Sequence, residues 1–172
     1  MANNVYSTIK FVSGNKEAED AFIEVFQCIE DSGETGLEFS HILPDDEYAD
    51  LEFMEWNIGP RVANLTKFMG TEVEITSAWI SPKNFFEILT EELSGYDPDV
   101  ALTMTYVDEF YNFAGVYWFA NLYSKDPGGG LGHQEESGGW FKFEHDMTGE
   151  DASLLPDFIT DTIEFWGATG CD

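Results

Sequence analysis

The chain has 172 residues, of which 43% are hydrophobic and 16% aromatic. A chain of this length and composition can bury a core without disulfides or metals, which excludes an intrinsically disordered protein. Charged residues make up 24%, but Asp and Glu number 34 against 7 Lys and Arg, so the net charge is −27. Such an excess repels itself in a compact fold, and we expect that a partner or a solvent condition selects it.

The cysteines and the hydropathy pattern predict a cytoplasmic protein. Cys28 lies in a helical pattern and Cys171 is the penultimate residue, an arrangement that favours two incidental thiols in a reducing compartment. The chain has no basic-then-apolar leader and no apolar run of about 18 residues. We therefore expect neither export nor a membrane span.

The first third predicts a strand, a helix and a second strand. Alternating residues over Val5–Val12 predict the first strand. Apolar residues at helical spacing predict a helix over Lys16–Asp31, with Asn15 as its cap. Weak alternation predicts a short second strand over Leu37–Leu43.

An acidic segment follows. Asp45–Glu55 holds six carboxylates among aromatic and aliphatic residues. A calcium loop is one interpretation, but the required glycine and the alternate-position ligands are missing, so we expect a solvated acidic segment and no metal. Trp56–Gly70 could be one irregular helix, and its Arg61 is expected to pair with a neighbouring carboxylate.

The central stretch predicts strand, helix, strand, strand. Glu72–Trp79 alternates as a third strand, and Ser81-Pro82 begins a second helix, where the missing N–H of proline costs nothing. Val100–Tyr106 and Phe113–Tyr123 are the fourth and fifth strands, joined by a tight hairpin.

The last third predicts a loop, a strand and a helix. Asp126–Gly138 is a glycine-rich flexible loop that lacks the lysine and the following helix of a phosphate cradle. Trp140–His145 alternates as a sixth strand, and Ser153–Trp166 has the pattern of a last helix.

The element order within residues 5–106 is β-α-β-β-α-β, the order of the ferredoxin-like split βαβ unit. We predict an α+β fold, with an antiparallel sheet and helices on one face, extended by a β-hairpin and a C-terminal helix. We expect a single domain over residues 1–172, with its core in about 5–123 and the hairpin extension and C-terminal helix in about 124–172.

Several short motifs carry a family resemblance over roughly 50 residues. They are Thr76-Ser77-Ala78-Trp79-Ile80-Ser81-Pro82 before a helix, Tyr96-Asp97-Pro98, Asp108-Glu109 and Phe113-Ala114-Gly115. With them the chain resembles the Api-ninety-two-like (YubB-like) family of phage and plasmid proteins. The resemblance implies a ferredoxin-like domain and a mobile-element origin, without an established chemistry.

The resemblance is incomplete in two places. The family has a Trp-Gly-Thr-Lys-Trp tract before its third strand, where this chain has only Trp56, Gly59 and Arg61. The second proline of the family's corner is Lys83 here. Whatever the missing tract does in the family is therefore not carried over.

Catalytic chemistry finds little support in the residues. His41, His133 and His145 are scattered, and no Ser or Cys lies in a nucleophile context. Carboxylate pairs are so abundant that their proximity in sequence means little. We expect a non-enzymatic protein with no cofactor and no metal.

The charge points to imitation of nucleic acid. A compact chain of this length is about 40 Å across, and about 40 Å of duplex carries about 24 negative charges, close to the −27 of this chain. In composition the chain is also similar to DNA-mimic inhibitor proteins. The expected partner is a basic nucleic-acid-binding host protein, such as a restriction or CRISPR effector, and we expect no direct binding to nucleic acid or membrane.

The expected partner-binding residues are carboxylates in three rows, of which the two helical rows step by three or four residues. They are Glu17, Asp20 and Glu24 on the first helix; Asp45, Asp46, Glu47, Asp50 and Glu52 in the acidic segment; and Asp157, Asp161 and Glu164 on the last helix.

Two other interpretations stay open. One is an acidic interaction module whose basic partner has nothing to do with nucleic acid. The other is a salt-adapted domain, although six of the seven basic residues are Lys and high-salt proteins favour Arg.

Overall fold

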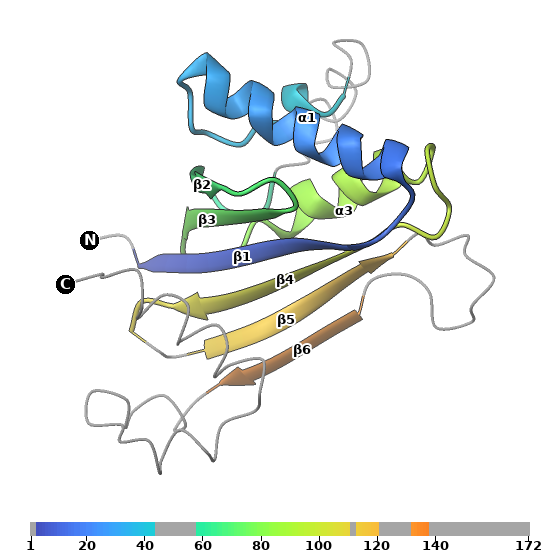
Figure 1. The fold of residues 1–172 in the computed structure, drawn as a ribbon. Coiled ribbons are helices and arrows are strands. Elements are labelled where there is room, and N and C mark those ends of the chain that lie inside the picture. The colour runs from blue at the N-terminus through green and yellow to red at the C-terminus, as the bar shows by residue number, and fades with distance from the viewer. Residues whose placement is uncertain (1–2, 44–57, 111–112, 121–131, 138–172) are drawn as a thin grey trace.

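The computed structural model describes residues 3–43, 58–110, 113–120 and 132–137. In these residues two α-helices lie on one face of a six-stranded antiparallel sheet (Figure 1). The helices are α1 (Lys16–Ser32) and α3 (Lys83–Leu93), with a short 3-10 turn η1 (Phe39–His41). The strands are β1 (Asn4–Ser13), β2 (Ala63–Phe68), β3 (Glu72–Ala78), β4 (Ala101–Asp108), β5 (Phe113–Ala120) and β6 (Gly132–Ser137).

The sheet order β2-β3-β1-β4-β5-β6 confirms the predicted fold class. Strands β1 to β4 and the two helices form the ferredoxin-like split βαβ arrangement, in which β3 lies between β1 and β2. Strands β5 and β6 continue the sheet beyond β4, each antiparallel to its neighbour. The predicted C-terminal helix Ser153–Trp166 and the predicted strand Trp140–His145 lie outside the described residues.

The core lies between the helices and the sheet. From α1, Phe22 and Phe26 are fully buried, and from α3, Phe85 and Phe86. The ring centroid of Phe26 lies 4.9 Å from that of Phe22, 6.3 Å from that of Phe85 and 6.1 Å from that of Phe86. Burial of these rings fixes both helices on the sheet, and with them the direction of their outer faces.

Three predicted segments differ from the structure. Leu37–Leu43 is not a strand: Gly36 forms an isolated bridge to Asn64, and η1 follows. The turn is favoured locally, since the Glu38 side chain accepts from the backbone N–H of His41 and the Glu38 N–H donates to Nδ1 of His41. Phe39, the first residue of this turn, is buried.

The second correction concerns Trp56–Gly70, which is not an irregular helix in its described part. Residues 63–68 form β2, which supplies the second strand of the predicted order. A register shift between Leu65 and Lys67 interrupts the alternation that would have marked the strand in sequence.

The third correction concerns Asp126–Gly138, predicted as a loop. Residues 132–137 form β6, whose backbone pairs with β5 from Phe113↔Ser137 to Trp118↔Gly132. Pairing with an existing strand outweighs a polar, glycine-containing composition.

The N-terminus of α1 follows the predicted cap. The side chain of Asn15 accepts from Ala18 N–H at 2.9 Å and donates to the carbonyl oxygen of Tyr96 at 2.9 Å. We expect Asn15→Ala to lower the free energy of unfolding by about 1–2 kcal/mol in urea titrations. Asn15→Ser keeps the acceptor and should lose less; equal losses in both variants would contradict the capping role.

Candidate functional site

Among the described helices and strands, α1 carries the most carboxylates, and they lie on its outer face. The helix carries six carboxylates against one lysine: Glu17, Glu19, Asp20, Glu24, Glu30 and Asp31 against Lys16. Its inner face is apolar, because Phe22, Phe26 and Ile29 recur at helical spacing and are fully buried. The carboxylates are therefore held toward solvent by the packing of the opposite face.

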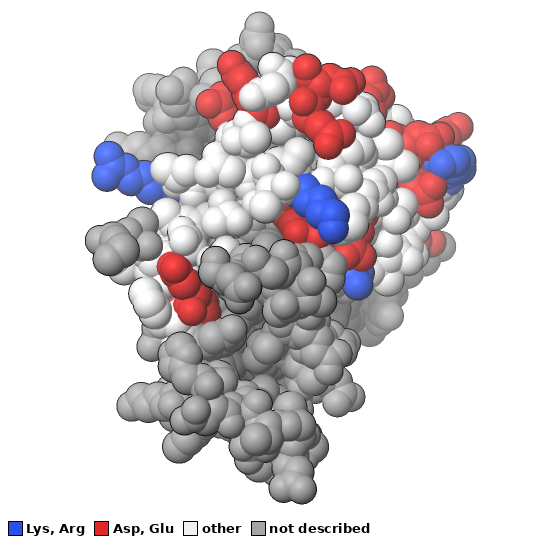
Figure 2. Space-filling model, turned by 60° about the vertical axis from the view of Figure 1, so that its left-hand side comes forward, with Lys and Arg blue, Asp and Glu red and all other residues white. Residues whose placement is uncertain are grey.

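The structure brings Glu17, Asp20 and Glu24 onto the exposed side of α1, as predicted. Figure 2 shows carboxylates gathered on the upper part of the molecule, where α1 lies in Figure 1. The other candidate residues lie outside the described residues: Asp45, Asp46, Glu47, Asp50, Glu52, Asp157, Asp161 and Glu164.

Lys16 neutralises part of this row. Its Nζ lies 2.7 Å from Oε1 of Glu19 and 2.7 Å from Oδ1 of Asp20. Lys16 donates hydrogen bonds to the carboxylates of Asp20 and then Glu19, and these bonds raise the pKa of Lys16 above its ordinary value. Within the described residues no cation pairs with Glu17 or Glu24, which leaves these two with uncompensated charge.

The other described lysines are also engaged. Lys10 pairs with Glu72, Lys67 with Glu74, and Lys83 with Glu87, at nitrogen–oxygen distances of 3.3, 3.4 and 3.7 Å. Cations that are already paired offer little to an acidic ligand. Arg61 is exposed and pairs with no described carboxylate, and the neighbouring carboxylates of Asp45–Glu55 lie outside the described residues.

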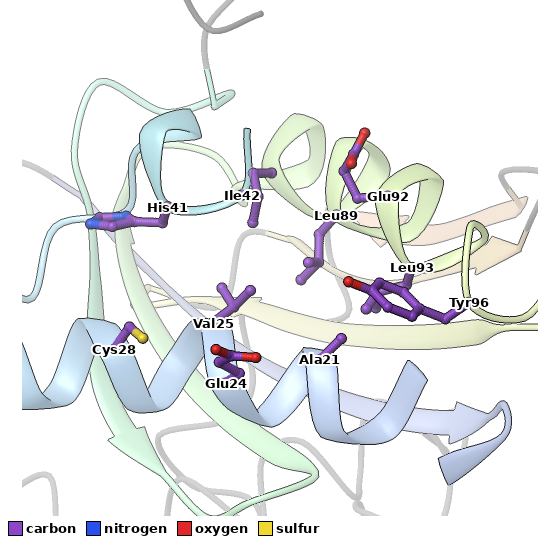
Figure 3. A pocket seen from close by; sticks show the side chains of 10 residues that line it. All are labelled: Ala21, Glu24, Val25, Cys28, His41, Ile42, Leu89, Glu92, Leu93 and Tyr96. Atoms are coloured by element: carbon purple, nitrogen blue, oxygen red, sulfur yellow. The ribbon is translucent and has the colours of Figure 1, made fainter. Parts of the chain in front are cut away.

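A pocket of about 260 Å³ lies between α1 and α3, beside η1 (Figure 3). Val25 from α1 and Leu89 and Leu93 from α3 form its apolar lining, and both leucines are buried. Glu24 and Glu92 contribute carboxylates from opposite sides, and Tyr96 lies at the end of α3. No local sequence pattern predicts this pocket, because its residues come from segments far apart in the chain.

A second surface feature lies at the corner after β3. Trp79 has φ 71°, a conformation that bulky residues rarely adopt, and its side chain is 59% exposed. The neighbouring Ile80 and Val62 are also exposed. The corner is held by backbone bonds from Trp79 N–H to Asn3 at 2.8 Å and from Ile80 N–H to Ala78 at 3.0 Å.

Gly59 lies against this corner. A side-chain Cβ at Gly59 would meet the carbonyl oxygen of Ser81 at 2.9 Å, and its φ of 113° also favours glycine. The sequence Trp79-Ile80-Ser81-Pro82, on which the family resemblance partly rests, is therefore a tightly turned corner that exposes apolar side chains.

The described residues contain no group of three or more His, Cys, Asp or Glu side chains arranged to hold a metal ion. None of their helices is long and apolar enough to cross a membrane. The acidic segment Asp45–Glu55, for which calcium was weighed, lies outside the described residues.

Fold and site together define an α+β protein of the split βαβ type with an acidic helical surface. Comparisons with family models, curated proteins and solved structures found no match to the chain. The resemblance to the Api-ninety-two-like family stays a prediction.

Proposed function

We propose that this protein is a non-enzymatic nucleic-acid mimic that occupies the basic groove of a host nucleic-acid-binding protein. The observation that supports the proposal most is the outer face of α1, where Glu17 and Glu24 are exposed and have no described cation beside them. The Cβ atoms of residues three or four apart on a helix lie about 5–6 Å from one another, so their carboxylates form a row. A row of lysines and arginines built for phosphates meets a comparable row of negative charges.

The mechanism is competitive occupation. Opposite net charges steer the partner toward the protein and speed association, and the attraction weakens as salt screens it. The inner face of the helix packs against Phe85 and Phe86, so its backbone needs no ordering on binding. Preorganisation of this kind lowers the entropic cost of association.

The proposed setting follows from the resemblance to phage and plasmid proteins. A mobile element benefits from an inhibitor of host defence, so we propose a restriction or CRISPR effector in the host cytoplasm as the target class. The protein itself carries no described cluster of unpaired cations, and it should not bind DNA or RNA.

A capture experiment tests the proposal. The immobilised protein is exposed to host lysate at moderate salt, and the retained protein is then challenged with duplex DNA or with polyglutamate of equal total charge. A nucleic-acid mimic predicts release by DNA at a concentration at which polyglutamate releases little. Equal release by both polymers would instead indicate an acidic interaction module with no relation to nucleic acid.

A further inference from the structure

The pocket between α1 and α3 combines an apolar lining with negative charge. Leu89 and Leu93 are almost fully buried, and Val25 faces them from α1. Glu24 and Glu92 supply carboxylates from the two helices, and both residues are exposed. An occupant that suits this combination has an apolar stem and a positively charged end.

The size of the pocket limits the occupant. Its volume of about 260 Å³ lies below the roughly 300–1,000 Å³ of sites for drug-sized ligands and above the roughly 150 Å³ cavity that holds benzene. A single long side chain fits a volume of this size.

Tyr96 adds an aromatic surface at a fixed place. Its carbonyl oxygen accepts from Asn15 Nδ2 at 2.9 Å, and its N–H donates to the carbonyl oxygen of Leu93 at 3.0 Å. The backbone of Tyr96 is thus tied to the start of α1 and to the end of α3, and Figure 3 shows its ring reaching toward the other lining residues. A planar guanidinium stacks on such a ring more effectively than an ammonium group does.

We propose that this pocket receives one arginine side chain of the basic partner, with its stem on Val25 and Leu89, its guanidinium on the Tyr96 ring, and Glu24 as its counter-ion. This inference rests on the proposed function and deepens it, since it assigns one anchoring contact within the acidic surface. Buried arginines are among the residues that contribute most to binding at protein interfaces. A row of surface charges alone gives attraction, whereas a filled pocket also gives register.

The test uses a small probe, so that no partner has to be known. N-acetyl-arginine-N-methylamide is titrated into the isotopically labelled protein, and the methyl resonances of Val25, Leu89 and Leu93 are followed by NMR. The uncharged citrulline analogue is the matched ligand control. We expect saturable chemical-shift changes at these methyl groups, with a dissociation constant of about 1 mM, and much smaller changes with the citrulline analogue.

Single substitutions that each remove one charge distinguish binding in the pocket from a general attraction to the acidic surface. Glu24→Gln is expected to weaken binding of the arginine probe about threefold. Tyr96→Ala is expected to weaken it by a similar factor, about threefold. Glu30→Gln removes the same charge from the same helix outside the pocket and should leave the affinity within error. Equal shifts with arginine and citrulline, or equal effects of the two Gln variants, would overturn the proposal.

The result is independent of the mimicry experiment. If arginine binds in the pocket but duplex DNA does not release the captured partner, the pocket stands and nucleic-acid mimicry fails. If DNA releases the partner but arginine does not bind here, mimicry stands and the arginine pocket is overturned.

Discussion

Phe26→Ala is expected to lower the free energy of unfolding by about 3–5 kcal/mol, a large share of the roughly 5–15 kcal/mol that stabilises an ordinary domain. The Phe26 ring is fully buried, and its centroid lies within 6.5 Å of those of Phe22, Phe68, Phe85 and Phe86. Truncation removes these contacts and leaves a cavity at the junction of α1, α3 and β2. Urea titration followed by tryptophan fluorescence measures the loss.

Gln27→Ala is the matched control for this prediction. Gln27 is the next residue of α1, is exposed, and makes one bond to Asp31 at 3.0 Å. Its replacement should change stability by less than about 0.5 kcal/mol. A loss below about 1 kcal/mol for Phe26→Ala would contradict the packing of α1 against α3 and the sheet.

Neutralising the carboxylate row on α1 is expected to weaken binding of the captured partner about tenfold. The triple variant Glu17→Gln, Asp20→Asn, Glu24→Gln removes three exposed charges, and each is worth about 0.5 kcal/mol in such contacts. The fold should be retained, because none of the three side chains is buried. Titrations at several salt concentrations should also give a shallower dependence of affinity on salt.

Two controls locate this effect. The triple variant Glu30→Gln, Asp31→Asn, Glu34→Gln removes the same charge from the last turn of α1 and the loop after it, and should weaken binding less. Lys16→Gln removes the cation that pairs with Glu19 and Asp20, so it should strengthen binding and steepen the salt dependence. Equal weakening by both triple variants would mean that only the net charge matters. An unchanged affinity in both variants would mean that the carboxylates do not contribute to binding of the partner.

The helices could be predicted because their signals are local. Ala18, Phe22, Phe26 and Ile29 follow the period of an α-helix and are all buried. The ends of α1 follow short-range chemistry as well, with Asn15 at the start and Gly33, at φ 73°, after the last turn. The outer acidic row follows from the same period, since the face opposite the core must be exposed.

The strands β2 and β6 could not be predicted in this way, because their stability comes from partners elsewhere in the chain. Ala63 pairs with Ser77, and Glu135 pairs with Gly115, in registers that no local pattern encodes. The pocket has the same origin: Glu24 and Glu92 come to line one pocket only after α1 and α3 pack on one sheet face. The pairing of Lys16 with Asp20, by contrast, follows a helical step of four residues and could be predicted from the sequence.

The most direct test of nucleic-acid mimicry is an equilibrium competition between this protein and duplex DNA for the captured partner. The apparent dissociation constant of the protein is measured by fluorescence anisotropy at increasing DNA concentration and constant ionic strength. Mimicry predicts that this constant rises in proportion to free DNA without a plateau, because the two ligands occupy one groove. A plateau, with both ligands bound to the partner at once, would contradict the account.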